Sequence, residues 1–316
     1  MMKLYKQKNI ALGSEAVLTI VSNRRKTEID AIFSELWIRT FKFEKRFSRF
    51  LPTSELSMFN RSSGSKQIIS EEFHDILQAA KRLSIDTGGL YNPFVLPALQ
   101  KAGYTQSFVK GAENDIHEDH SRKSVVSIDK LEFGSDWARI PYGTAIDLGG
   151  CGKGFLADQL ADYIQSRVIG YSISLGGDIV CGGLDENGAN FSVTIQKVNS
   201  YDDEIVGEII MLIQKYSVAS SGITKRRGSN NGSAWHHIID PKTLEPAKTD
   251  ILLATVCHAS GLYADVLASC CVILGSRKSK SFLRSHGVND ALFQVTDADG
   301  GLTTLHMGKM ILQGTY

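Results

Sequence analysis

The sequence predicts a mixed α/β protein, closer to the α+β type, with a largely antiparallel sheet and flanking helices. Three observations lead to this prediction. Short apolar runs typical of strands alternate with turn residues, and amphipathic helical patterns occur between them. Some of these runs come singly and others in apparent hairpins, as expected for antiparallel pairing. No Pro- or Ser-rich linker divides the 316 residues, so we expect a single domain over residues 1–316 although the length would allow two.

The N-terminal third is predicted to hold one strand and two helices. A strand is expected within residues 11–21, where Leu, Val and Ile dominate. Over residues 26–50 the apolar side chains recur every three or four positions, which predicts a long helix with one buried face. Ser70 is predicted to cap a second helix, because two glutamates and then an apolar stripe follow it. Gly88 and Gly89 should end that helix.

The remainder of the chain alternates strand-like and helical patterns. The strand-like runs are residues 125–128, 131–133, 171–175, 191–195, 208–213 and 251–256. Helices are predicted over residues 155–165 and 262–274. The polar segment 107–122 contains acidic residues and histidines that would suit a metal, but no apolar pattern holds them in place, so a solvated loop is favoured.

Composition and charge exclude several classes of partner. The 35 Lys and Arg residues nearly balance the 34 Asp and Glu residues, and the formal charge is only +1, which argues against nucleic acid. The longest apolar stretch, residues 264–275, is too short to span a bilayer, so we expect no membrane insertion. No apolar signal-peptide region follows the polar N-terminus. Five cysteines without a CxxC pair favour reduced, buried thiols, and together these points predict a cytoplasmic protein.

The densest motif is the glycine-rich segment of residues 145–164, AIDLGGCGKGFLADQLADYI. Four glycines surround Lys153, and a helical stripe begins directly afterwards. Such a loop can present backbone N–H groups and a helix N-terminus to a phosphate. Its spacing fits neither the Walker A loop nor GxGxxG. A tight turn that packs a helix against a strand explains the glycines equally well.

Two further segments contain residues suited to chemistry. In residues 221–246 the adjacent His236 and His237 should face opposite sides of an extended chain, so at most one enters a given cleft. In residues 261–275 Asp265 and Ser269 are four apart and share a helix face. This pair could hold a hard cation such as Mg²⁺, or Asp265 could make a structural hydrogen bond.

Taken together and in order, these segments resemble the FAD:protein FMN transferase family, the ApbE-type flavin transferases. The resemblance covers nearly the whole chain. The segments that carry it are ALGS (11–14), FEKRFSRFLPTSELSMFN (43–60), TGGLYNPFVLPAL (87–99), AIDLGGCGKGFLADQL (145–160), SLGGDIVCGG (174–183), SVASSG (217–222), HHIIDPKT (236–243) and YADVLAS (263–269). It implies a single composite, T-fold-like flavin-transferase domain.

The resemblance also implies an activity and its participants. FAD is the substrate, Mg²⁺ is the metal cofactor, and the FMN part is transferred through its phosphate to a Thr or Ser hydroxyl of a target flavoprotein, with release of AMP. The target would be a cytoplasmic flavoprotein, for example a soluble reductase. Two alternatives share the site: an FAD pyrophosphatase that uses water as acceptor, and a flavin-binding protein without catalysis.

The same resemblance assigns roles to individual residues. His237 matches the base that takes the proton of the attacking hydroxyl. The metal would be held by the backbone of Gly150 with Asp265 and Ser269. The residues that would bind FAD are Leu12, Phe50, Leu90, Tyr91, Asn92, Asp147, Lys153 and Ile239.

Four positions depart from the family pattern. Asn92 stands where Asp is common, Ser269 where Thr is common, and Leu244 where Gly is common. Ser269 keeps a hydroxyl for the metal, and Asn92 keeps an acceptor while losing a charge. Phe50 occupies a position where Tyr or Asn is frequent, and we associate this position with the balance between transfer and hydrolysis.

Overall fold

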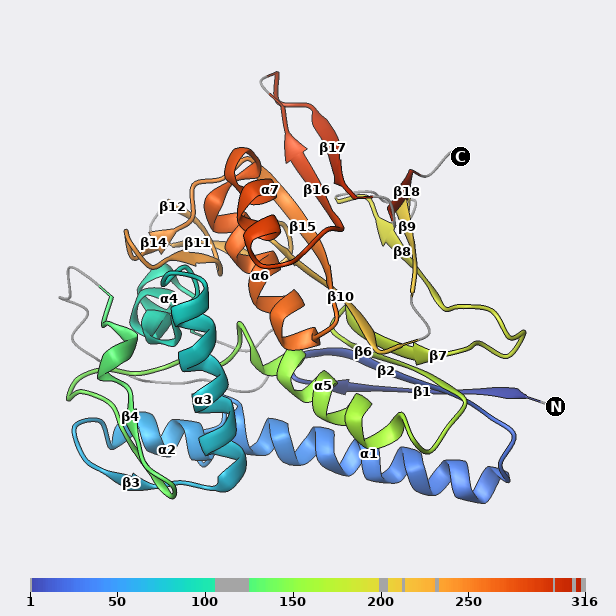
Figure 1. The fold of residues 1–316 in the computed structure, drawn as a ribbon. Coiled ribbons are helices and arrows are strands. Elements are labelled where there is room, and N and C mark those ends of the chain that lie inside the picture. Colours follow the sequence, from blue (N-terminus) through green and yellow to red (C-terminus); the bar gives the residue numbers. More distant parts are fainter. Residues whose placement is uncertain are drawn as a thin grey trace.

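The computed structural model describes residues 2–105, 125–198, 204–211, 214–230, 233–297, 299–308 and 311–313. Its centre is an eight-stranded sheet in which every neighbouring pair is antiparallel (Figure 1). The strands, in spatial order, are β1 (Lys3–Ala11), β2 (Ser14–Ser22), β6 (Gly170–Leu175), β7 (Asp178–Gly183), β10 (Tyr216–Gly222), β15 (Ile251–His258), β16 (Ala291–Thr296) and β17 (Leu302–Met307). The predicted mixed fold with a largely antiparallel sheet is confirmed.

A layer of helices packs against one face of this sheet. Helix α1 (Lys26–Phe47) contacts β1 and β2, α5 (Gly152–Ile164) contacts β6 and β7, and α6 (Gly261–Leu274) contacts β10 and β15. Successive helices also contact each other, and α7 (Ser276–Ser285) follows α6 (Figure 1). The buried side chains of these helices and of the facing strand positions form the main core.

The opposite face is partly covered by a small sheet of β18 (Ile311–Gln313), β9 (Ile205–Ile210) and β8 (Ser192–Gln196). Alternation along β15 explains the two layers, because Val256 packs toward α6 whereas Cys257 packs toward β8 and β9. Both ends of the chain therefore contribute to the packing around one sheet.

Most of the remaining elements lie between β2 and β6 along the chain. They are α2 (Glu55–Arg61), β3 (Gln67–Ile68), α3 (Glu71–Asp86), the 3₁₀ turn η1 (Pro93–Val95), α4 (Leu96–Ala102), the 3₁₀ turn η2 (Ile128–Lys130), β4 (Glu132–Phe133) and β5 (Trp137–Arg139). Two short hairpins, β11 (Arg227–Asn230) with β12 (Ser233–His236) and β13 (Ile239–Asp240) with β14 (Glu245–Pro246), precede β15.

Most predicted elements are present, with shifted ends. Ser70 caps α3 as predicted, since its Oγ accepts a hydrogen bond from the Phe73 N–H at 3.2 Å. Helix α1 ends at Phe47 rather than continuing to residue 50. The long strand β1 was not predicted, because it is an exposed edge strand whose lysines hide the alternation.

One predicted strand is wrong. Residues 125–127 have no regular structure and η2 begins at Ile128, because the Ser127 side chain accepts a hydrogen bond from the Asp129 N–H and starts a turn. Strand β9 covers the first part of the run predicted at 208–213, but residues 212 and 213 lie outside the described residues. The polar segment 107–122 also lies outside them. No described helix is both long enough and apolar enough to cross a membrane.

Candidate active site

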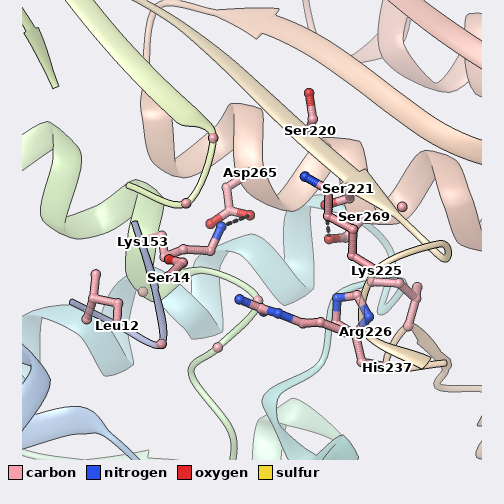
Figure 2. A pocket seen from close by; sticks show the side chains of 18 of the residues that line it. Leu12, Ser14, Lys153, Ser220, Ser221, Lys225, Arg226, His237, Asp265 and Ser269 are labelled. Carbon is pink, nitrogen blue, oxygen red and sulfur yellow. Dashed lines mark hydrogen bonds and ion pairs between the residues drawn. The ribbon is translucent and has the colours of Figure 1, made fainter. Parts of the chain in front are cut away.

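A cavity of about 950 Å³ is lined by residues of the helical layer, the glycine-rich loop, β8 and the segments that flank the β11–β12 hairpin. All twelve residues selected from the sequence line it: Leu12, Phe50, Leu90, Tyr91, Asn92, Asp147, Gly150, Lys153, His237, Ile239, Asp265 and Ser269. They come from segments up to 257 positions apart, so the fold alone brings them together. Figure 2 shows several of them projecting into the same space.

The glycine-rich loop lines the cavity, and the tight packing of a helix that the sequence left open is present. Gly149 and Gly150 line the cavity, and α5 begins directly after them with no side-chain hydrogen bond from its N-cap residue. Gly154, one turn into α5, packs against α6 instead. A Cβ added there would lie 2.4 Å from the carbonyl oxygen of Gly261. The loop therefore exposes backbone to the cavity while its last glycine allows two helices to approach closely.

Three charged side chains cluster beside this loop. Lys153 forms an ion pair with Asp178 on β7, and its Nζ lies 3.9 Å from Oδ1 of Asp265 on α6 (Figure 2). The Gly154 N–H donates a hydrogen bond of 3.2 Å to the other oxygen of Asp265. Burial raises the pKa of Asp265, and the charge of Lys153 and the Gly154 N–H oppose that rise. Burial lowers the pKa of Lys153, which the charge of Asp265 opposes.

Two hydroxyl groups that line the cavity contact each other between α6 and β10. Ser269 lies on the same face of α6, as predicted, and its Oγ is 2.8 Å from Oγ of Ser221 on β10. Asp178 also contacts β10, because its Oδ1 accepts a 3.1 Å hydrogen bond from the Ser220 N–H. Among the described residues, no three His, Cys, Asp or Glu side chains form a group that could hold a metal. A metal here would need hydroxyl, backbone and ligand oxygens beside Asp265.

The adjacent histidines face opposite sides, as predicted. His236 Nε2 lies 3.0 Å from the carbonyl oxygen of Ala247, so this side chain has a structural contact outside the cavity. His237 lines the cavity, and its buried Nδ1 has no hydrogen-bond partner within the described part of the chain. Burial and then the charge of Arg226 lower the pKa of His237 to about 3. Its imidazole is therefore neutral at neutral pH.

An arginine that the sequence analysis did not select organises another wall. Arg49 is 6% exposed, and its Nε lies 3.1 Å from Oδ1 of Asp147. Its guanidinium carbon also lies 4.2 Å from the ring centroid of Phe50 and 4.6 Å from that of Tyr104. The Tyr104 ring in turn meets the ring of His237 edge to face, with centroids 6.1 Å apart. This stack links Asp147 to His237 through packed side chains.

The segment after α3 supplies an apolar and hydrogen-bonded wall. Tyr91 donates a hydrogen bond of 3.0 Å to Sγ of Cys151, which fixes its ring beneath Gly150. Both the NH₂ group and the oxygen of the Asn92 side-chain amide form hydrogen bonds within the protein. Its Nδ2 donates to the Val126 carbonyl at 3.0 Å, and its Oδ1 accepts from the Phe94 N–H at 2.9 Å. Asn92 thus shapes the wall, and its amide suits these two partners better than a carboxylate.

Two of the selected or divergent positions have unusual backbone conformations. Leu12 has φ of 54° and forms, with Gly13, the two-residue turn between β1 and β2. Leu244 has φ of 57° in the turn between β13 and β14. The left-handed region favours glycine, which gives a physical reason for the Gly expected at position 244.

Four residues of the site were not predicted from the sequence: Arg49, Ser221 and Arg226 line the cavity, and Asp178 forms an ion pair with the cavity residue Lys153. Asp178 and Ser221 lie inside motifs that were noticed, directly after Gly177 and before Gly222. A polar residue beside such a glycine was the available signal. Arg49 and Arg226 had no comparable signal, because each stands in a segment with neighbouring basic residues.

Comparison with known proteins identifies the family. A model of the ApbE family matches residues 12–293. The chain belongs to the ApbE family. Relatives named FAD:protein FMN transferase include one from Vibrio cholerae serotype O1, 27% identical over 279 residues, which cover 87% of this chain and 81% of the relative. Another, from Treponema pallidum, is 26% identical over 311 residues, which cover 93% of this chain and 85% of the relative.

Solved structures of ApbE proteins share the fold. The apo flavinyl transferase ApbE of Pseudomonas stutzeri superposes with a TM-score of 0.80 at 20% identity, over 96% of this chain and 95% of that chain. The ApbE protein of Thermotoga maritima gives a TM-score of 0.81 at 20% identity, over 95% and 96% of the two chains. The predicted fold class and family are both confirmed.

Proposed function

We propose that this ApbE protein is a Mg²⁺-dependent FAD:protein FMN transferase. It moves the FMN part of FAD to a Thr or Ser hydroxyl of a target flavoprotein and releases AMP. The names of its relatives support the reaction class. The observation that carries the proposal for this chain is one cavity that combines a neutral histidine, a lysine beside two buried carboxylates, and an open glycine-rich loop.

The residues of the cavity divide into three tasks. The apolar walls, with Leu12, Phe50, Leu90, Tyr91 and Ile239, would accommodate the flavin ring. Lys153 and the loop at Gly150 would face the diphosphate, since a cation and the N-terminus of α5 favour phosphate oxygens. Asp147, held by Arg49, and Asn92, held by Val126, would keep this site rigid.

The donor chemistry near Asp265 fits Mg²⁺. A carboxylate oxygen of Asp265, Oγ of Ser269 and a backbone oxygen of Gly150 would hold the ion, since Mg²⁺ prefers such hard oxygen ligands. When bound, Mg²⁺ neutralises charge that develops on the phosphate. The ion pair between Lys153 and Asp178 would leave Asp265 available for that task.

His237 would act as the general base. The hydroxyl oxygen of the target attacks the phosphorus of the FMN phosphate, and the bond from that phosphorus to the bridging oxygen breaks. His237 takes the hydroxyl proton, and AMP leaves with the bridging oxygen. Burial is the main cause of the low pKa of His237, and the charges of Arg226 and Lys153 add to it; a bound diphosphate would offset those charges and raise the pKa above about 3.

The decisive experiment mixes the protein with FAD, Mg²⁺ and a flavoprotein domain that carries the acceptor Thr. We expect a covalent FMN adduct by mass spectrometry, absent when the acceptor Thr is changed to Ala. Accumulation of FMN and AMP without an adduct would assign FAD hydrolysis instead. Unchanged FAD would leave only flavin binding.

Matched variants test the two central roles. His237→Gln should reduce transfer by about 10²–10⁴-fold with FAD binding nearly retained, whereas His236→Gln should stay within a few-fold of the wild type. Asp265→Asn should raise the Mg²⁺ concentration needed for half-maximal transfer. Asp162→Asn, an exposed change on α5, should not. A wild-type Mg²⁺ dependence of Asp265→Asn would remove this residue from the metal site.

We further propose a cytoplasmic target, such as a soluble reductase, and a single domain over residues 1–316. All five cysteines are free and buried, which suits a reducing compartment. The central sheet takes strands from both ends of the chain, which supports one domain. Fractionation of the cells followed by detection of FMN-modified proteins in each fraction tests the compartment.

A further inference from the structure

Arg226 occupies an unusual position in the cavity. Its carbonyl oxygen accepts a hydrogen bond of 3.2 Å from the His237 N–H, so the backbone holds the two residues side by side at the start of the β11–β12 hairpin. Both line the cavity. Figure 2 shows the Arg226 side chain extending away from His237, across the cavity, toward the side that carries Lys153.

The guanidinium of Arg226 has no partner among the residues that the structure describes. In the described parts of the chain it makes no hydrogen bond and no ion pair within 4 Å. Of the other cations that line the cavity, Arg49 pairs with Asp147, Lys153 with Asp178 and Lys197 with Glu204, whereas Lys225 is exposed to solvent. A partly buried cation without a counter-ion is costly, so its position is best explained by an anionic ligand.

The charge of Arg226 acts on three titratable groups of the cavity. Its charge lowers the pKa of His237, of Lys153 and of Asp265. An anion bound by Arg226 would therefore sit between the neutral histidine and the Lys153 cluster. The rings and charges around His237 are those of Tyr104, His236, Arg226 and Lys153.

We propose that Arg226 binds the phosphate oxygens of the dinucleotide substrate and places them against His237. This inference rests on the proposed function, since it takes the diphosphate of FAD as the anion. The planar guanidinium can donate two parallel hydrogen bonds to one phosphate, which fixes the orientation as well as the charge. Phosphoryl transfer depends mainly on such positioning and on neutralisation of charge.

The test compares two adjacent arginines. Arg226→Gln removes the charge in the cavity, and Arg227→Gln removes the same charge from an exposed position outside its lining. Both changes are made in the His237→Gln background with Mg²⁺ present, so that turnover does not consume the ligand. Binding of FAD, ADP and riboflavin is measured by fluorescence and calorimetry, and thermal unfolding checks the fold.

We expect Arg226→Gln to weaken FAD binding by about 10- to 100-fold, as for the loss of charge-assisted hydrogen bonds, and to leave riboflavin binding unchanged. Arg227→Gln should change neither by more than a few-fold. Wild-type FAD affinity of Arg226→Gln, or an equal loss of riboflavin affinity, would overturn the assignment. If the His237→Gln protein binds ADP but not FAD, and Arg226→Gln weakens ADP binding by about 10- to 100-fold, the proposed function fails and Arg226 remains a phosphate ligand. If it binds neither, both fail.

Discussion

The contact between α5 and α6 at Gly154 predicts that Gly154→Ala lowers the stability of the protein, whereas Gly152→Ala, two residues earlier, does not. A Cβ at Gly154 would lie 2.4 Å from the Gly261 oxygen and 2.8 Å from the Leu262 Cα. Both are backbone atoms, so relief requires the helices to separate by about 1 Å to reach ordinary contact. A Cβ at Gly152 would lie 3.6 Å from the Phe43 ring, which is already ordinary contact.

The expected free energies of unfolding follow from these distances. Replacing Gly by Ala in a helix contributes at most about 1 kcal/mol in both variants. Overpacking typically costs about 1–3 kcal/mol, and it applies only at position 154. Gly154→Ala should therefore lose about 1–2 kcal/mol, whereas Gly152→Ala should be neutral or gain up to about 1 kcal/mol.

Urea denaturation followed by circular dichroism measures both variants against the wild type. Separation of the helices should also break the hydrogen bond from the Gly154 N–H to Asp265, so Gly154→Ala should need more Mg²⁺ for transfer. Equal stability of the two variants, or a more stable Gly154→Ala, would refute the close approach of α5 and α6.

Three more predictions follow from contacts of single side chains. Asn92→Asp should destabilise the protein by about 1–3 kcal/mol, because it loses a donor and sets a carboxylate against the Val126 carbonyl; a thermal melt near the wild-type value would contradict this. Asp158→Ala should cost about 2 kcal/mol in urea denaturation, because this carboxylate accepts three hydrogen bonds at the start of α6, whereas Asp162→Ala on the same helix should cost under about 0.5 kcal/mol. His237 has a folded-state pKa near 3, below its unfolded value, so the unfolded chain binds more protons and stability should fall as the pH drops from about 6.5 toward 3. His237→Gln should flatten that part of the stability profile, and an unchanged slope would refute the burial of the imidazole.

The pattern of the sequence was sufficient where local rules decide structure. The apolar period of α1, the cap at Ser70 and the four-residue spacing of Asp265 and Ser269 all predicted what the structure contains. The alternation predicted that at most one of the two histidines enters the cavity, and the structure places His237 there and His236 outside it. Motif order placed the chain in its family, and each of the twelve selected residues lines the cavity.

Predictions of secondary structure failed where contacts with residues distant in the sequence, or side-chain capping, decide the local structure. Strand β1 is held by pairing with β2, although its own alternation is weak. Residues 125–128 were predicted as a strand, but Ser127 within this run caps the turn η2. Such outcomes depend on pairing and capping, which no local pattern of apolar residues encodes.

By itself, the sequence determined the fold class, the family and the residues that gather in one cavity. These properties depend on periodicity and motif order, which are written along the chain. Only the tertiary structure decided that Lys153 pairs with Asp178, that the Asn92 amide is used internally, and that the Arg226 guanidinium faces the cavity without a partner among the described residues. Charge compensation depends on distances between atoms from distant segments, and such distances exist only after folding.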